Sequence, residues 1–406
     1  MGKYELYQKV TKNPLNRHAI FGPTFSKELL TPAPLRSTRR AYGPDVIGPP
    51  GLVTSVVQRK GTTVTEENRS MPCPGLAEER SAIVAALGHF QNPSVRRGLT
   101  QFATTILGYL ALVAIMFAAF DRGIWAAAIL VVPAAGFVVR LFIIQHDCGH
   151  RSYFRSQRAN AIVGWLCSLV TLTPYASWRR QHSRHHAVWN NLDYRRDATD
   201  IYATCLTLGE YRELSTVQRW LYRAVRHPVI AHFILPPLVF LLLYRIPFDT
   251  PATWSAERRS VYFTNATFAV MLAVLIALLG WKPVLFVQIS TIALSSITGV
   301  WLFAVQHKFE DAEWMRQPQW TPLRAALSGT SYLKLPPLLQ WFTGNIGFHH
   351  VHHLLPRVPN YRLEDCHKAL LALTGGVRTI TLAEALVAPS FALWDEAGGR
   401  MVPFPR

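Results

Sequence analysis

The chain has 406 residues, half of them apolar, and carries a formal net charge of +18 at pH 7. This apolar content is more typical of a membrane protein than of a soluble protein of the same length. No nucleic-acid recognition motif accompanies the charge, and the five cysteines form no close pairs. Composition therefore argues against nucleic-acid binding, a disulfide framework and a zinc or iron–sulfur site held by cysteines.

The first 95 residues are polar and rich in proline, with five prolines between positions 32 and 51 and no apolar core of the kind a signal peptide needs. Such a composition buries too little apolar surface to order a chain, so residues 1–95 are predicted to be a disordered cytoplasmic tail. Residues 96–390 are predicted to form one membrane domain, followed by a C-terminal tail over residues 391–406.

Four stretches have about the 20 apolar residues that a helix needs to cross a bilayer. They cover residues 101–120, 124–145, 262–280 and 284–305. Only three residues separate the members of each pair, so we expect an all-α integral membrane fold with four transmembrane helices arranged as two hairpins. A shorter stretch at 160–177 is doubtful as a span. Another at 229–244 has basic residues at both ends and is expected to dip into the membrane or lie along its interface, and not to cross it.

Arginines predict the orientation of these spans. Residues 151–226 contain 12 arginines against five acidic residues, and Arg96 and Arg97 precede the first span. The positive-inside rule places both regions, and with them both termini, on the cytoplasmic side of the inner membrane. Attraction to anionic membrane lipids explains most of the charge. A docking surface for an acidic electron-transfer protein is the alternative.

Three short strings hold nine of the fifteen histidines: HDCGH, HSRHH and HHVHH. They supply His146 and His150, then His182, His185 and His186, then His349, His350, His352 and His353. Spacings of three and four residues place imidazoles on one face of a helix, so each string can present several metal ligands. Neutral imidazole suits iron, copper, zinc and nickel, and eight or nine nitrogens exceed the capacity of one ion. The strings therefore predict two metal ions without naming the metal.

The strings and their surroundings resemble the membrane fatty acid desaturase family, in its bacterial acyl-lipid branch. The resemblance runs from about residue 92 to residue 361 and rests on QHDCGHRSYF, TLTPYASWRRQHSRHHAVWNNLD, GVWLFAVQHKFED and GNIGFHHVHHLLPRVPNY. It implies two non-haem irons held by histidines in a cytoplasmic cap, with interfacial helices beside the four spans. The implied ligands are His146, His150, His182, His185, His186, His349, His352 and His353, with His307 as a ninth.

Metal-bound imidazoles need a partner for their second ring nitrogen. Asp147, Asp193, Glu310 and Asn345 lie beside or between the strings and are candidates, although a nearby arginine could pair with any of them. His350 occupies a position of the third string that does not bind metal in the family, so it is expected to support the ligands or to be incidental. Aromatic residues near the strings could line an acyl tunnel or belong to the core or the interface. They are Trp165, Tyr175, Trp178 and Trp301.

The resemblance implies a fatty acyl desaturase that uses O2 and two electrons to introduce a cis double bond into an acyl lipid or acyl thioester. A hydroxylase or ketolase of a lipid, alkane or carotenoid on the same scaffold is the first alternative. A metal transporter is disfavoured because ionisable residues are nearly absent from the spans. No HPGG string marks a fused cytochrome b5 domain. A separate ferredoxin or cytochrome, with its reductase, is therefore the expected electron donor.

Overall fold

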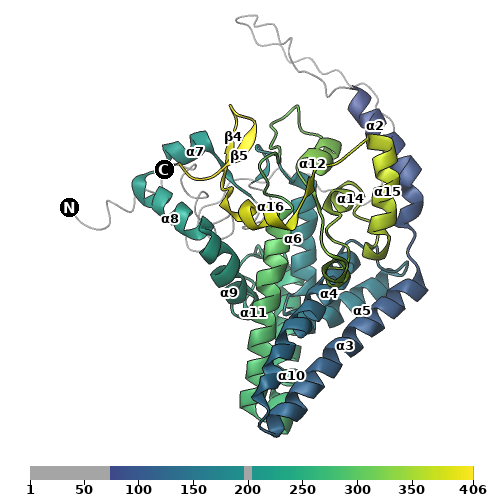
Figure 1. The fold of residues 1–406 in the computed structure, drawn as a ribbon, viewed down its shortest axis with the longest axis vertical. Coiled ribbons are helices and arrows are strands. Elements are labelled where there is room, and N and C mark those ends of the chain that lie inside the picture. Colours follow the sequence, from purple (N-terminus) through teal and green to yellow (C-terminus); the bar gives the residue numbers. More distant parts are fainter. Residues whose placement is uncertain (1–73, 196–203, 406) are drawn as a thin grey trace, which may run out of the picture.

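The computed structural model describes residues 74–195 and 204–405, and these are almost entirely helical (Figure 1). The α-helices are α2 (Pro74–Leu87), α3 (Val95–Asp121), α4 (Val131–Gly149), α5 (Gln157–Thr171), α6 (Tyr175–Val188), α7 (Leu208–Glu213), α8 (Thr216–Arg226), α9 (Leu235–Leu241), α10 (Ser255–Leu279), α11 (Trp281–Val305), α12 (Pro322–Ser328), α13 (Pro337–Phe342), α14 (His349–Leu354), α15 (Leu363–Thr374) and α16 (Leu382–Val387). Short 3-10 or π segments also occur: η2 (Gly88–Gln91), η3 (Trp125–Leu130), η5 (Ile230–Ile234), η6 (Leu243–Arg245), η7 (Asn360–Arg362) and η8 (Ala388–Ser390).

The strands are only two or three residues long. They are β1 (Leu206–Thr207), β2 (Tyr332–Leu333), β3 (Thr379–Ile380), β4 (Leu393–Asp395) and β5 (Arg400–Val402). β4 pairs in parallel with β1 and antiparallel with β5, and β2 pairs in parallel with β3. The sheets therefore join distant parts of one helical fold, and the predicted all-α class is confirmed.

Four helical segments are long and apolar enough to cross a membrane, which confirms the four predicted spans. They are α3, η3 with α4, α10 and α11, and they extend to the lower end of the molecule in Figure 1. Gly123 and Gly280 stand at the two hairpin turns with φ of +72° and +81°, a region that side chains other than glycine rarely adopt. Val270 and Leu278 on α10 are 66% and 75% exposed, as expected of a surface that faces hydrocarbon.

One of the shorter apolar stretches is bent within itself, and the other is bent against the helix before it. α5 and α6 meet at 102° around Leu172, which has a φ of +53°, and α8 meets the segment from η5 to η6 at 54°. The bends agree with the expectation that neither stretch is a straight span. α8 exposes Val217 and Trp220 by 69% and 67%.

α4 is the central helix of the membrane part, because α3, α5 and α11 all pack against it. Its buried Arg140 donates to Thr105 Oγ1 and to the carbonyl of Trp341 in α13, and its guanidinium lies 4.0 Å from the Trp341 ring. Arg140 thus fixes the end of α13 against α4, a few residues before the third histidine string begins.

Both predicted tail boundaries are wrong for the residues that the structure describes. Residues 78–95 belong to the fold: Ile83 and Leu87 are 5% and 2% exposed and pack with Leu363 and Leu370 of α15. The apolar residues Ile83 and Leu87 share a helix face, a short signal that the polar composition around it concealed. Residues 391–405 also contribute to the core, through the β4–β5 hairpin and the fully buried Leu393. Residues 1–73 lie outside the described part.

Candidate metal centre

Four helices bring the histidines together. His146 lies in the last turn of α4, and His150 directly follows that helix. α6 supplies His182, His185 and His186, and α14 supplies His349, His352 and His353. His307 follows the end of α11, where its backbone N–H donates to the carbonyl of Ala304. Two spans therefore end at the cluster, and two short cap helices complete it.

The histidines form two groups. In the first histidine group, one ring nitrogen from each of five residues lies within 4.8 Å of the others, and the members are His146, His150, His182, His186 and His352. A separate set of three also has ring nitrogens within 4.8 Å of one another, and its members are His185, His307 and His353. His349 joins these three because its Nε2 lies 2.9 Å from Nε2 of His307, and the four make up the second histidine group. All nine histidines predicted from the sequence are thus brought together, as five and four.

Hydrogen bonding alone does not explain the first histidine group. His146 Nδ1 donates to Asp147 Oδ1 at 3.1 Å, which leaves a lone pair on its Nε2. Nε2 of His352 lies 3.0 Å from that atom and 2.9 Å from Nε2 of His186. A neutral imidazole has only one N–H, and a ring nitrogen that donates does not also accept. Nε2 of His352 therefore cannot form hydrogen bonds in both contacts. A shared cation would satisfy the converging lone pairs, and the site fits a metal.

The other chemical properties of the cluster also suit metal binding. Burial lowers the pKa of several imidazoles well below the ordinary value, and the neighbouring histidines lower it further. The low pKa keeps these imidazoles in the neutral form that binds metals. These are His150, His182, His186, His307, His349, His352 and His353. Nε2 of His150 and Nε2 of His353, one atom from each group, are buried without a hydrogen-bond partner in the described part of the chain.

A buried polar network orients His146. Oδ2 of Asp147 accepts two hydrogen bonds from Asn360, one from its backbone N–H at 2.6 Å and one from its side-chain amide at 2.8 Å. Asn360 Oδ1 in turn accepts from Gln101 of α3 at 2.7 Å, and the Asn360 carbonyl accepts from Asn345. The structure therefore places Asp147 where the sequence suggested and makes Asn345 a more remote member. Asn360 and Gln101 were not predicted, although Asn360 lies in the quoted PNY end of the third motif.

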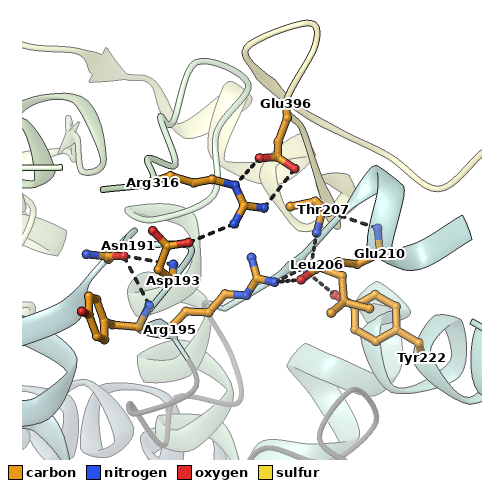
Figure 2. A network of polar contacts seen from close by, with 10 residues as sticks. Asn191, Asp193, Arg195, Leu206, Thr207, Glu210, Tyr222, Arg316 and Glu396 are labelled. Atoms are coloured by element: carbon orange, nitrogen blue, oxygen red, sulfur yellow. Dashed lines mark hydrogen bonds and ion pairs between the residues drawn. The ribbon is translucent and has the colours of Figure 1, made fainter. Parts of the chain in front are cut away.

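The structure does not bring Asp193 or Glu310 to the cluster. Figure 2 shows that Arg316 lies between Asp193 and Glu396, at 2.9 Å and 2.8 Å. Glu310 pairs with Arg400 at the surface. Each of these two carboxylates therefore pairs with an arginine at the surface, which was the alternative to supporting a histidine ligand.

His350 is also away from both histidine groups. Its Nε2 lies 2.9 Å from Nδ1 of His367, and the His367 ring packs against Tyr332 and Phe348. One position along a helix rotates the side chain by about 100°, which explains why His350 and His349 face different neighbours. The described contacts assign His350 to the packing of α14 against α15 and give it no contact that would orient a ligand.

The candidate tunnel aromatics lie in different places. Trp178 stacks on His182 with ring centroids 4.8 Å apart and also approaches His146 at 5.8 Å. Tyr175 is buried against α5, Trp165 stacks on Phe263, and Trp301 packs on the core around Leu302. Of the four, Trp178 alone has a described ring contact with the histidine groups.

The second histidine group has an aromatic neighbour that the sequence reading missed. The ring centroid of Trp189 lies 3.9 Å from that of His307 and 5.0 Å from that of His185. Its Nε1–H donates to the carbonyl of Gly329. Trp189 follows the second string by three residues, at the end of α6. No spacing rule distinguishes it from the other tryptophans of the chain.

Comparison with known proteins agrees with this site. Residues 122–379 match the family described as fatty acid desaturase. The chain is 39% identical over 329 residues to a fatty acid desaturase of Bacillus subtilis, which covers 81% of this chain and 92% of the relative. These matches confirm the resemblance, and the chain belongs to the fatty acid desaturase family.

Two more distant relatives carry more specific names. An sn-1 acyl-lipid omega-3 desaturase (ferredoxin) of Synechocystis is 28% identical over 254 residues, 58% of this chain and 64% of the relative. An acyl-lipid omega-3 desaturase (cytochrome b5) of the Arabidopsis thaliana endoplasmic reticulum is 28% identical over 271 residues, 61% of this chain and 67% of the relative. The family thus includes proteins named for acyl-lipid substrates and for two kinds of electron donor.

Proposed function

We propose that this protein is an acyl desaturase in which the two histidine groups each hold one non-haem iron. The observation that carries the proposal is the arrangement of nine buried or half-buried imidazoles as five and four, with converging Nε2 atoms that hydrogen bonding does not satisfy. When bound, a pair of irons supplies the activation of O2 that removal of hydrogen from an unactivated methylene requires.

The protein's own residues hold and orient this site. Asp147 fixes the tautomer of His146, so that Nε2 of the ring faces the first histidine group. Trp178 stacks on His182 and Trp189 packs on His307, so each group has an apolar ring beside it that restricts the orientation of a ligand. An acyl chain has no polar handle at its reactive carbons, so its position must be selected by the shape of the apolar surface around it.

The names of the relatives support a proposal for the electron donor and the substrate class. Two relatives are named for ferredoxin or cytochrome b5 and act on acyl lipids, and we propose a separate donor of one of these kinds here. We also propose that the cluster lies on the cytoplasmic face of the inner membrane, because the segments around it are rich in arginine. Residues 1–73 contain none of the nine histidines, and we propose that they are dispensable for the reaction.

Expression in a host with saturated lipids tests the proposal. Mass spectrometry of the acyl chains should reveal products two hydrogens lighter, and the purified protein should contain about two irons, one for each histidine group. Products heavier by one oxygen would instead favour the hydroxylase alternative. Zinc as the tightly bound native metal, with no iron-dependent product, would contradict the proposed centre.

A further inference from the structure

The surface beside the first histidine group has a cavity of about 360 Å³ with an unusual lining. Four of its nine lining residues are arginines, brought together from three separate segments. The lining consists of Gly149, His150, Arg151, Arg179, Arg180, Ser183, Glu257, Pro356 and Arg357, and we call it the arginine pocket. Its volume suits a small polar group such as a phosphate ester.

The positive charge of the arginine pocket is only partly neutralised. Glu257 is its one carboxylate and pairs with Arg180 at 2.9 Å. In the described part of the chain, no carboxylate forms an ion pair with Arg151, Arg179 or Arg357. Three guanidinium groups therefore remain available to an anionic ligand, and guanidinium is well matched to phosphate oxygens because it donates in pairs.

Parts of the arginine pocket are held in place before any ligand binds. The guanidinium of Arg180 lies 4.0 Å from the ring of Trp254, and that of Arg179 lies 5.7 Å from the ring of Tyr175. Arg151 has a φ of +58°, which is uncommon for a residue with a side chain. It directs the chain away from α4 immediately after His150. Such ordering lowers the entropy that binding would otherwise cost.

The level of the arginine pocket along the spans indicates where its ligand comes from. Gly149 ends the second span, and Glu257 lies in the first turn of α10, the third span. Both residues lie near ends of these apolar helices, so we expect the arginine pocket at the level of the lipid headgroups. A basic surface at this depth attracts anionic headgroups. A concave site next to His150, and not a flat basic face, is what a small headgroup requires.

From these observations we propose that the arginine pocket binds the phosphate of the acyl carrier, and that this carrier is a phospholipid of the membrane. The inference rests on the proposed function, because it identifies the substrate class of the same site. The phosphate would hold the substrate by its polar end while the acyl chain enters the apolar part of the protein. Coenzyme A offers the same phosphate chemistry and is the alternative source.

Binding measurements on the full-length, iron-loaded protein in nonionic detergent test the inference. The probe is dihexanoyl-phosphatidylglycerol, compared with dihexanoyl-glycerol, which lacks the phosphate. Arg151→Gln and Arg357→Gln should each weaken phosphatidylglycerol binding about tenfold, since each removes one charge-assisted contact. Binding of the neutral lipid should not change. Arg357→Lys, which keeps the charge but not the paired donors, should give an intermediate loss.

Arg158→Gln is the matched control, because Arg158 is an exposed arginine on α5 that is not in the pocket lining. It should bind phosphatidylglycerol like the wild type. Each variant is first checked for wild-type iron content, so that misfolded protein is not counted. In the desaturation assay, the two glutamine variants should raise KM for a long-chain phospholipid and leave kcat nearly unchanged.

Other outcomes separate the alternatives. If coenzyme A competes for the arginine pocket and phosphatidylglycerol does not, the phosphate inference stands and the lipid source is wrong. Equal losses for phospholipid and neutral lipid, or none for either, would overturn the inference. So would an unchanged lipid affinity together with a raised KM for ferredoxin, which would make the surface a protein docking site. Because phosphate binding is measured without turnover, a wild type that binds phospholipid but forms no double bond would refute only the proposed function.

Discussion

The two histidine groups are built differently, although α6 and α14 contribute to both. In the first, the position of a ligand is fixed by a carboxylate: Asp147 bonds His146 and is itself held by Asn360. In the second, no carboxylate of the described residues contacts the His307 side chain, which packs against the rings of Trp189, Phe303 and other histidines. Nδ1 of His349 is buried without a hydrogen-bond partner among the described residues.

The difference matters because a carboxylate and an aromatic ring affect a ligand in different ways. An anionic acceptor fixes the tautomer and makes the imidazole a stronger donor to metal. A ring restricts orientation through packing but gives the second ring nitrogen no anionic acceptor. We therefore expect the metal in the first histidine group to depend on polar substitutions, and the metal in the second to depend on the shape of its surroundings.

The largest effect is expected from removing a histidine at the centre of the first group. His352 contacts both His146 and His186, so His352→Ala should reduce product formation at least about 100-fold and lower the iron content. His349→Ala and His353→Ala should act similarly through the second group. Product is measured per unit of membrane-inserted protein.

His350→Ala is the control for these variants, since His350 lies in the same helix but contacts His367. It should retain iron and a measurable fraction of activity, with some loss of stability from the cavity that it leaves. An inactive, iron-free His350→Ala protein beside an active His349→Ala protein would show that the ligand face of α14 has been misassigned.

A smaller effect is expected from the polar network. Asp147→Asn keeps the size of the side chain but removes the charge that stabilises His146, and should lower iron affinity or activity by about 10- to 100-fold. Asn360→Ala should have the same direction and a smaller size, because Asp147 would keep its bond to His146. Titration of the apoprotein with ferrous iron should show one weakened site and one normal site. Equal weakening of both sites would mean that the two groups do not differ as described.

The spans and the nine clustered histidines could be predicted because their signals are local. A span is a continuous apolar run, and residues three or four apart share a helix face wherever the helix lies. The network around Asp147 has no such signal, since Asn360 is 213 residues from Asp147 and 259 from Gln101. Asp193 and Glu310 show the converse, because closeness to a histidine string in sequence did not bring their carboxylates to the cluster. The position of the α2 helix was missed because two apolar residues in a polar segment are a weak pattern.

Trp189→Phe tests the second histidine group. The variant keeps a ring beside His307 but loses the hydrogen bond from Nε1 to the Gly329 carbonyl, which costs about 1–3 kcal/mol for a buried acceptor. We expect a lower unfolding temperature and a loss of activity of only about two- to fivefold, since the packing that orients His307 is largely preserved. Ferrous iron titration should now show the second site weakened. If the first site weakens instead, the ring contact does not distinguish the groups.

The smallest effect is expected at Asp193, a carboxylate that follows the second string by seven residues. Its side chain is 35% exposed and pairs with Arg316, which also binds Glu396 (Figure 2). Solvent-exposed ion pairs contribute about 0–1 kcal/mol, so Asp193→Asn should change the unfolding temperature little and leave both iron sites and the rate of desaturation unchanged. The same substitution at Asp147 removes a buried charge that contacts the predicted ligand His146. The ratio of the activities of the two variants measures how much the Asp147 carboxylate contributes to the reaction. An Asp193→Asn protein as impaired as Asp147→Asn would contradict the assignment of Asp193 to the surface of the cap.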